Sequence, residues 1–144
     1  MTVKIVLAAD HAGYELKEKV KKHLIEKGHL VLDVGCNCED SCDYPDYGRK
    51  AAQMVASGEM ERGVLVCGTG TGMVICANRF EGVRAALCFD LFGTCMCRRH
   101  NDANILVLAG CMTGDKLALA IVDEFFNEEF EGGRHLKRIQ KLDQ

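Results

Sequence analysis

The sequence predicts a three-layer α/β/α sandwich, Rossmann-like, around a five-stranded parallel sheet. Five short apolar runs rich in β-branched residues recur along the chain, and an amphipathic segment with helical spacing follows each of them. Strands that are apolar throughout are buried on both faces, and right-handed crossovers place helices on both sides of such a sheet. A chain of 144 residues, 48% of them hydrophobic, has the size of one ordinary domain, so we expect a single domain over residues 1–144.

Strands and helices are expected to alternate from the N-terminus onward. Residues 3–9 form the first apolar run, and Leu16, Val20 and Leu24 follow at helical spacing until Gly28 gives a stop signal. The same reasoning predicts strands at 30–34, 63–67, 83–88 and 105–109, and helices at 47–56, 71–79, 91–99 and 113–127. A glycine pair then precedes a short basic helix expected at 134–142, although such a segment can equally be a solvated terminus.

Composition and charge argue against nucleic-acid and membrane partners. The net charge of -3 gives no strong field to attract nucleic acid, and the longest apolar runs fall well short of the roughly 18 residues that cross a bilayer. Nine cysteines, an odd number in a chain without a secretory signal, indicate reduced thiols rather than disulfides. We therefore expect a soluble cytoplasmic protein.

Three of the cysteines, Cys36, Cys38 and Cys42, lie together in one loop. A structural zinc site requires four ligands, and this loop offers three with no evident fourth. We therefore expect no metal site here and interpret the thiols as solvent-facing residues of a tolerant loop.

A glycine-rich loop joins the third predicted strand to the third helix. Gly68, Gly70 and Gly72 alternate with Thr69 and Thr71, which leaves backbone N–H groups free to converge on an anion at the positive end of the helix. The loop lacks the lysine of a Walker loop and the third glycine of a dinucleotide-binding fingerprint. It also lacks the arginine of a cysteine phosphatase loop and the strand-end aspartate of a phosphoacceptor receiver.

Ionisable side chains stand where predicted strands and helices end. Cys67 ends the third strand beside a helix N-terminus, where a thiol ionises more readily, so it is either a base or a small buried apolar residue. Asp10 and His11 follow the first strand and suit proton shuttling, although Asp10 could equally cap the next helix. If the two strands are neighbours, both loops face one crevice. His100 ends the fourth helix, where a favourable cation is the alternative interpretation.

Six segments of the chain together carry a resemblance to a known family. They are Asp10–Gly13, Asp43–Pro45, Cys67–Gly70, Asn78 with Gly82–Ala85, Arg99–Asn104 and Glu131–His135. They occur in order and at family spacing across nearly the whole chain. The chain resembles the type B ribose-5-phosphate isomerases, which include the related allose- and galactose-phosphate isomerases.

The resemblance implies aldose–ketose isomerisation of a five-carbon sugar phosphate through an enediolate, without a metal or another cofactor. By its position, Cys67 resembles the residue that serves these enzymes as the base that moves a proton between C1 and C2 of the sugar. The amides from Gly68 to Gly72, with Thr69, resemble the anion hole. His100, assisted by Asp10 or Asp43, resembles the group that opens the sugar ring.

The resemblance also implies how the substrate is held. His11, Tyr44 and Asn101 would position the hydroxyl groups, and Arg134 and Arg138 would bind the phosphate. Family members are homodimers, sometimes paired into tetramers, in which the His100 region and the C-terminal segment complete the partner's site. The family sheet has the strand order 2-1-3-5-4.

One departure from the family pattern weakens the assignment of the substrate. Cys111 stands where ribose-phosphate members commonly have an arginine that contacts the phosphate. Arg98 or Arg99 could replace that contact, or the substrate could be a six-carbon sugar phosphate such as allose 6-phosphate or galactose 6-phosphate. A non-enzymatic anion-binding module is a further alternative, whereas the missing phosphatase arginine and the absence of a CxxC motif disfavour a thiol redox or phosphatase-like protein.

Overall fold

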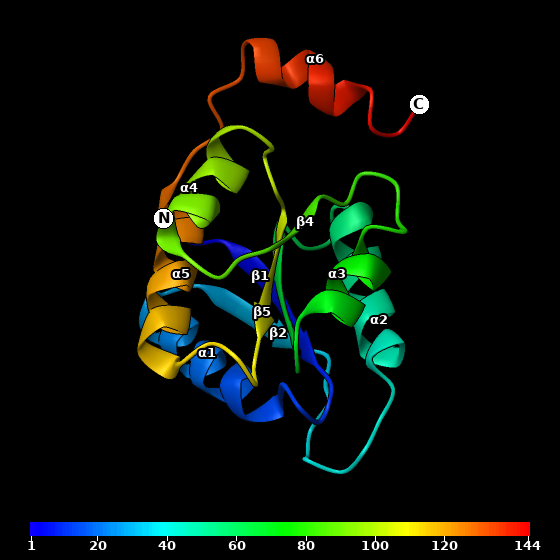
Figure 1. The fold of residues 1–144 in the computed structure, drawn as a ribbon, viewed down its shortest axis with the longest axis vertical. Helices are drawn as coiled ribbons and strands as arrows, with labels where there is room; N and C mark the ends of the chain where they lie inside the picture. Colours follow the sequence, from blue (N-terminus) through cyan, green and yellow to red (C-terminus); the bar gives the residue numbers. More distant parts are fainter.

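The computed structural model describes residues 1–144, and its centre is one sheet of five parallel strands (Figure 1). The strand order is β2-β1-β3-β5-β4, which confirms the order that the family resemblance implied. In the β3–β5 pair, Gly63 lies opposite Ile105 at one end and Cys67 lies opposite Ala109 at the other. The strands are β1 (Lys4–Ala9), β2 (Leu30–Asp33), β3 (Arg62–Cys67), β4 (Ala85–Leu87) and β5 (Ile105–Ala109).

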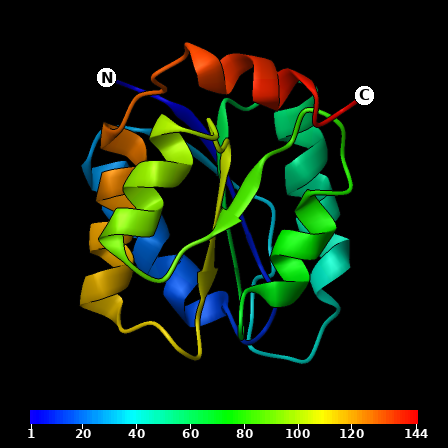
Figure 2. The same cartoon turned by 45° about the horizontal axis from the view of Figure 1, so that its top comes forward.

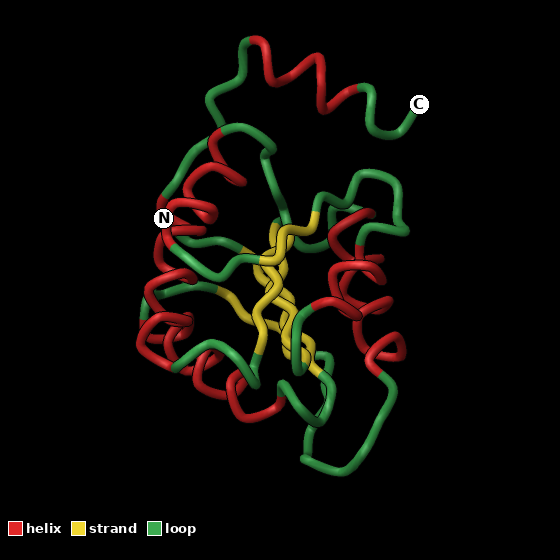
Figure 3. Tube along the Cα trace, viewed as in Figure 1, coloured by secondary structure: helices red, strands yellow, loops and turns green.

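Helices cover both faces of the sheet and form the predicted outer layers. The first layer contains α1 (Tyr14–Glu26), α4 (Leu91–Arg99) and α5 (Asp115–Asn127), and the second contains α2 (Tyr44–Ala56) and α3 (Thr71–Ala77). Figures 1 and 3 show these two layers on either side of the strands. The last helix, α6 (Arg134–Gln140), lies across one end of the sheet, as Figure 2 also shows. None of the helices combines the length and the apolar character needed to cross a bilayer.

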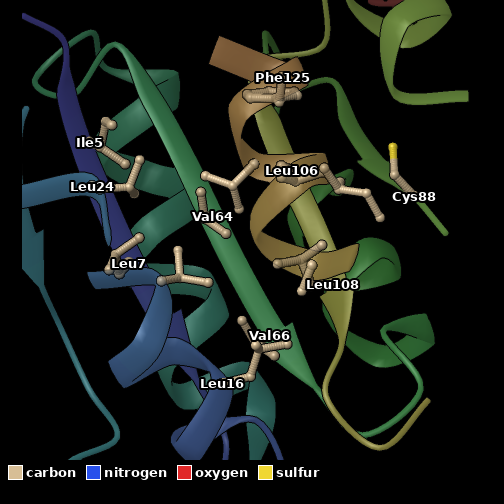
Figure 4. Packing of buried hydrophobic residues seen from close by; sticks show 14 of the residues in the cluster. Ile5, Leu7, Leu16, Leu24, Val64, Val66, Cys88, Leu106, Leu108 and Phe125 are labelled. Carbon is tan, nitrogen blue, oxygen red and sulfur yellow. The ribbon is translucent and has the colours of Figure 1, made fainter. Parts of the chain in front are cut away.

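The core is divided into two halves by the sheet, because successive residues of a strand point to opposite faces. Ile5 and Leu7 pack toward α1 and α5, whereas Val6 and Ala8 pack toward α2 and α3. Figure 4 shows part of the first half, with labels on Ile5, Leu7, Leu16, Leu24, Val64, Val66, Cys88, Leu106, Leu108 and Phe125. This packing on both faces explains why the central strands β1, β3 and β5 are apolar along most of their length.

Helices α2, α3, α5 and α6 each differ from the predicted range at one boundary, and the differences in α2 and α3 have identifiable reasons. Helix α2 begins at Tyr44 rather than at residue 47, because Pro45 sits in the first turn, where no backbone N–H is needed. Helix α3 ends at Ala77, two residues early. The Asn78 side chain follows it and donates to the carbonyls of Val74 at 3.1 Å and Ala85 at 2.9 Å. Asn78 therefore ties the end of α3 to the start of β4.

A buried lysine that sequence analysis did not single out fixes the loop after β2. The Lys17 side chain is fully buried in α1, and its Nζ donates to both carboxylate oxygens of Asp33, at 2.7 and 2.6 Å, and to the Cys36 carbonyl at 2.7 Å. Burial alone would raise the pKa of Asp33, but hydrogen bonds from Lys17 and Lys21 outweigh burial and lower it. These bonds hold the start of the cysteine-containing loop against α1.

Candidate active site

Three loops converge where β1, β3 and β5 end. The Cys67 carbonyl accepts a hydrogen bond from Gly110 N at 2.8 Å, and the Gly68 carbonyl accepts one from Cys111 N at 3.0 Å. A Cβ atom at Gly68 would lie only 3.6 Å from the Cβ of Ala12, in the loop after β1. Because β1 and β3 are neighbours, the loops that carry Asp10 and Cys67 lie side by side at the same end of the sheet.

The glycine-rich loop is packed so tightly that two of its glycines have no room for a side chain. Gly70 has a φ of +80°, and a Cβ there would overlap the Leu87 side chain. A Cβ at Gly72 would overlap the ring of Tyr44. The backbone N–H groups of Gly68, Thr69, Gly70 and Gly72 donate to no acceptor in the chain, whereas Thr71 N donates to the Thr69 hydroxyl at 3.4 Å. The loop therefore offers several unused donors beside a helix N-terminus.

The Cys67 side chain lies at the base of this loop and is 4% exposed. Its residue ends β3 and packs with the α2–α3 half of the core. A thiol in this place can exchange a proton with a bound molecule whose developing negative charge meets the free amides. That arrangement suits a reaction in which a carbanion or an enediolate forms.

Asp10 and His11 lie at the neighbouring strand end, together with the residues that begin α2. Asp10 is buried, and its Oδ1 accepts from Gly13 N at 3.0 Å, which holds the turn before α1. The N-cap residue of α1 is Gly13, without a side-chain cap, so the interpretation of Asp10 as the helix cap is wrong. His11 Nδ1 accepts from Cys42 N at 3.2 Å, so the neutral ring carries its proton on Nε2. A pocket of about 520 Å³ is lined by Asp10, His11, Cys42, Asp43, Tyr44, Pro45 and Asp46.

The remaining predicted site residues lie at the opposite end of the sheet. Asn104 O accepts from Gly63 N at the start of β3, so the segment that contains His100 and Asn101 lies at the strand beginnings, far along β3 from Cys67. Helix α6 lies at this same end (Figures 1 and 2). A pocket of about 270 Å³ there is lined by His100, Asn101, His135, Arg138, Ile139 and Leu142. Arg134, also in α6, is exposed and does not line it.

At this second end, His100 belongs to a cluster that sequence analysis did not assign. The rings of His100 and His135 stack with centroids 4.2 Å apart and planes 14° apart. The Oε1 atom of Glu131 lies 3.7 Å from His100 Nε2 and 3.8 Å from His135 Nε2. Its other oxygen accepts from Arg99 Nε at 2.7 Å. The only signal in the sequence was the i, i+4 spacing of Glu131 and His135.

Two groups of side chains bring together donors that a metal ion could use. The first is His100, Glu131 and His135, and the second is Cys95, Glu124 and Glu128. The imidazoles of the first group are stacked and nearly parallel, so their nitrogen lone pairs lie in nearly parallel planes, which fits a shared tetrahedral ion between them poorly. The three cysteines of the loop after β2 form no such group.

Three expectations about individual residues need correction. Arg98 cannot replace the arginine missing at position 111, because it is buried and donates to the carboxylate of Asp102 and to the carbonyl of Ala103. Within one chain Arg99 is paired with Glu131 and lies at the other end of the sheet from Cys111, so it could replace that arginine only across a subunit interface. Cys36 does not face solvent, since it is 1% exposed and burial raises the pKa of its thiol to about 11.

Comparison with known proteins gives consistent matches over almost the full chain. The model of the Ribose/Galactose Isomerase family matches residues 5–142. Ribose-5-phosphate isomerase B of Escherichia coli (strain K12) is 40% identical, over 96% of this chain and 93% of that protein. The crystal structure of a ribose 5-phosphate isomerase from Thermotoga maritima is 53% identical with a TM-score of 0.96, and the match covers 98% of this chain and 97% of that one. Ribose-5-phosphate isomerase B from Mycoplasma genitalium, with bound ribulose-5-phosphate, is 38% identical with a TM-score of 0.92 and coverages of 96% and 92%.

Proposed function

The chain belongs to the ribose/galactose isomerase family, and on this premise we propose that it interconverts ribose 5-phosphate and ribulose 5-phosphate. The names of the relatives and the ribulose-5-phosphate bound in the Mycoplasma genitalium structure support this substrate pair. The observation that carries the proposal is the Cys67 thiol at the base of a loop whose amides have no acceptor in the chain. Such a loop stabilises an oxyanion that exists only during the reaction.

The chemistry assigned to this loop is a proton transfer along the sugar chain. The thiolate of Cys67 takes the proton from C2 of the open-chain aldose, the electron pair forms the C1–C2 double bond, and the amides of Gly68, Gly70 and Gly72 hold the enediolate. The thiol then returns the proton to C1, while a proton passes from the oxygen on C2 to the oxygen on C1. The proton transfers need no external oxidant or reductant, so the proposal includes no metal or cofactor.

The remaining roles concern ring opening and binding. Ribose 5-phosphate is mostly a closed hemiacetal, and His100, assisted by Asp10 or Asp43, would move the proton that opens the ring. His11, Tyr44 and Asn101 would hold the hydroxyl groups. Arg134 and Arg138, at i and i+4 on α6, would bind the phosphate through charge-assisted hydrogen bonds.

These roles require groups from both ends of the sheet in one site. In a single chain Cys67 lies where β3 ends, whereas His100 and α6 lie where the strands begin. A second copy of the chain could place its His100 and α6 against the loops at the strand ends of the first copy. The groups from both ends of the sheet would then meet in one site. We therefore infer a homodimer, or a dimer of dimers, with each site at the interface between two subunits.

The direct test is turnover of ribose 5-phosphate, with and without a chelator. We expect activity that survives the chelator and falls at least roughly a hundredfold in kcat in Cys67→Ala, the loss typical of a missing general base, with phosphate affinity nearly intact. Cys38→Ala is the matched control, because that thiol is exposed on the loop after β2. A Cys67→Ala protein with normal kcat would remove Cys67 from the mechanism.

A second candidate substrate class follows from Cys111. This residue is exposed, and its Sγ would lie 3.5 Å from a Cβ at Gly68, so the position borders the glycine-rich loop without supplying a charge. A longer sugar would place its phosphate farther from this position, which favours allose 6-phosphate or galactose 6-phosphate as the alternative. A higher kcat/KM for either of them than for ribose 5-phosphate would select that alternative.

A further inference from the structure

We propose that Glu131 is a positioning residue for ring opening, and that its carboxylate holds the His100 imidazole in place beside a negative charge. This inference rests on the proposed function, because that function assigns the opening of the closed sugar to His100. Glu131 lies in the segment between α5 and α6, and its ion pairs are with residues at the end of the sheet where the strands begin.

The backbone of Glu131 is anchored to the helix that ends at His100. Glu131 N donates to the Arg99 carbonyl at 3.0 Å, a group that lies at the C-terminal end of α4 and has no acceptor role within that helix. The next two residues, Gly132 and Gly133, have φ values of +70° and +58°, which residues with side chains rarely adopt. The chain is therefore held at Glu131 and turns sharply into α6.

The side chain of Glu131 connects an arginine to two imidazoles. Its carboxylate accepts from Arg99 Nε, and this hydrogen bond is the main reason that the pKa of Glu131 is lowered. Glu131 is consequently a carboxylate at neutral pH. It is also the one ion-pair partner that the structure gives to His100 and to His135.

The stacked imidazoles make this negative charge necessary. Burial lowers the pKa of His135, the positive charges of His100, Arg134 and Arg138 lower it further, and Glu131 opposes them. The Nε2 atom of His135 is buried without a hydrogen-bond partner. The other charges that act on His135 are therefore all positive. Glu131 is the negative charge available to offset a proton held on either ring for the sugar oxygen.

Replacing Glu131 by glutamine tests this role, because Glu131→Gln keeps the size and an oxygen for Arg99 but removes the charge. We expect turnover of ribose 5-phosphate to fall at least about tenfold, part of the roughly hundredfold or more that a positioned acid–base group supplies. We also expect the limb of the pH–rate profile that depends on the imidazole pair to move to lower pH. Glu131→Asp keeps the charge and should keep the wild-type pH profile even where its turnover is reduced.

A second measurement isolates ring opening from the later proton transfer. The C5 oxygen of ribulose 5-phosphate carries the phosphate, so this ketose cannot close into a five-membered ring. Exchange of its C1 proton with solvent deuterium, followed by NMR, therefore requires the enediolate step but no ring opening. In Glu131→Gln this exchange should stay close to the wild-type rate while turnover of ribose 5-phosphate falls.

The matched control is Glu128→Gln. The carboxylate of Glu128 lies 3.9 Å from Arg99 Nε and has no ion pair with either imidazole, so both rates should stay near wild type. Equal losses of turnover and exchange in Glu131→Gln would mean that the residue only maintains the structure, and this would overturn the inference. Unchanged turnover, or the same pH shift in Glu131→Asp, would also overturn it. A wild-type protein without sugar-phosphate turnover would instead refute the proposed function.

Discussion

Mixing two inactive variants should restore activity if each site takes residues from two chains. In Cys67→Ala the change affects the strand-end loops, and in His100→Ala it affects the opposite end of the sheet. Each variant alone should lose roughly a hundredfold or more of its turnover. In a mixed dimer, one site combines both changes, and the other combines an intact Cys67 from one chain with an intact His100 from its partner.

The size of the recovery follows from symmetry. Random reassembly of equal amounts makes half of the dimers mixed, and each mixed dimer has one intact site out of two, so about a quarter of wild-type activity should return. The two chains would carry different tags, be unfolded in urea, mixed and refolded, and be assayed for conversion of ribose 5-phosphate. Mixed dimers purified through both tags should reach about half of wild-type activity.

The matched control pairs Cys67→Ala with Thr69→Ala, two changes at the same end of the sheet. Every site of that mixed dimer carries one of the two changes, so mixing should give no gain over the parents. If purified mixed dimers of Cys67→Ala and His100→Ala were no more active than their parents, the two residues would not act in one shared site. The reasoning from the two separated groups would then be refuted.

Three further predictions test other parts of the structure. Removing the residues after Gly132 should raise KM for the sugar phosphate because Arg134 and Arg138 are lost, and an unchanged KM would place the phosphate elsewhere. Lys17→Met should lower the free energy of unfolding in urea at pH 7 by about 1 to 3 kcal/mol, because it removes the buried partner of Asp33 and leaves Lys21 as the remaining cation, whereas Lys19→Met, at an exposed pair, should change it little. The pKa of Asp33 is lowered in the folded state, so its contribution to the free energy of unfolding is fully present above about pH 4. This contribution is lost as the pH falls through the pKa of Asp33 in the folded state, so the stabilities of the wild-type protein and Lys17→Met should converge in acid. Gly70→Ala should reduce both the melting temperature and kcat, because its φ is +80° and Leu87 occupies the space, whereas Gly114→Ala, with open space around it, should change neither greatly.

The apolar runs predicted the elements of this fold well because the central strands β1, β3 and β5 are buried on both faces. Residues 105–109 and 91–99 became β5 and α4 with the predicted bounds. The start of α2 lies before the predicted residue 47, because Pro45 is tolerated in a first helical turn. The strand order came from the family resemblance, since short apolar strands carry little information about which neighbour they pair with.

The candidate site was predictable where it depends on local sequence and unpredictable where it depends on distant contacts. The alternating glycines of the loop that follows Cys67 predicted an anion-binding loop there. The contact of Glu131 with Arg99 joins residues far apart in the chain, and no pattern in the sequence specifies it. The salt bridge of the buried Lys17 with Asp33 was missed for the same reason, because a lysine on an amphipathic helix is usually solvated.

The separation of Cys67 and His100 by the length of the central strand also bears on how the enzyme responds to dilution. If catalysis requires two chains, lowering the protein concentration below the dissociation constant of the pair would abolish turnover while each monomer stayed folded. Specific activity would then rise with enzyme concentration until the dimer saturates. The abundance of the protein would set the activity of each molecule as well as the number of molecules.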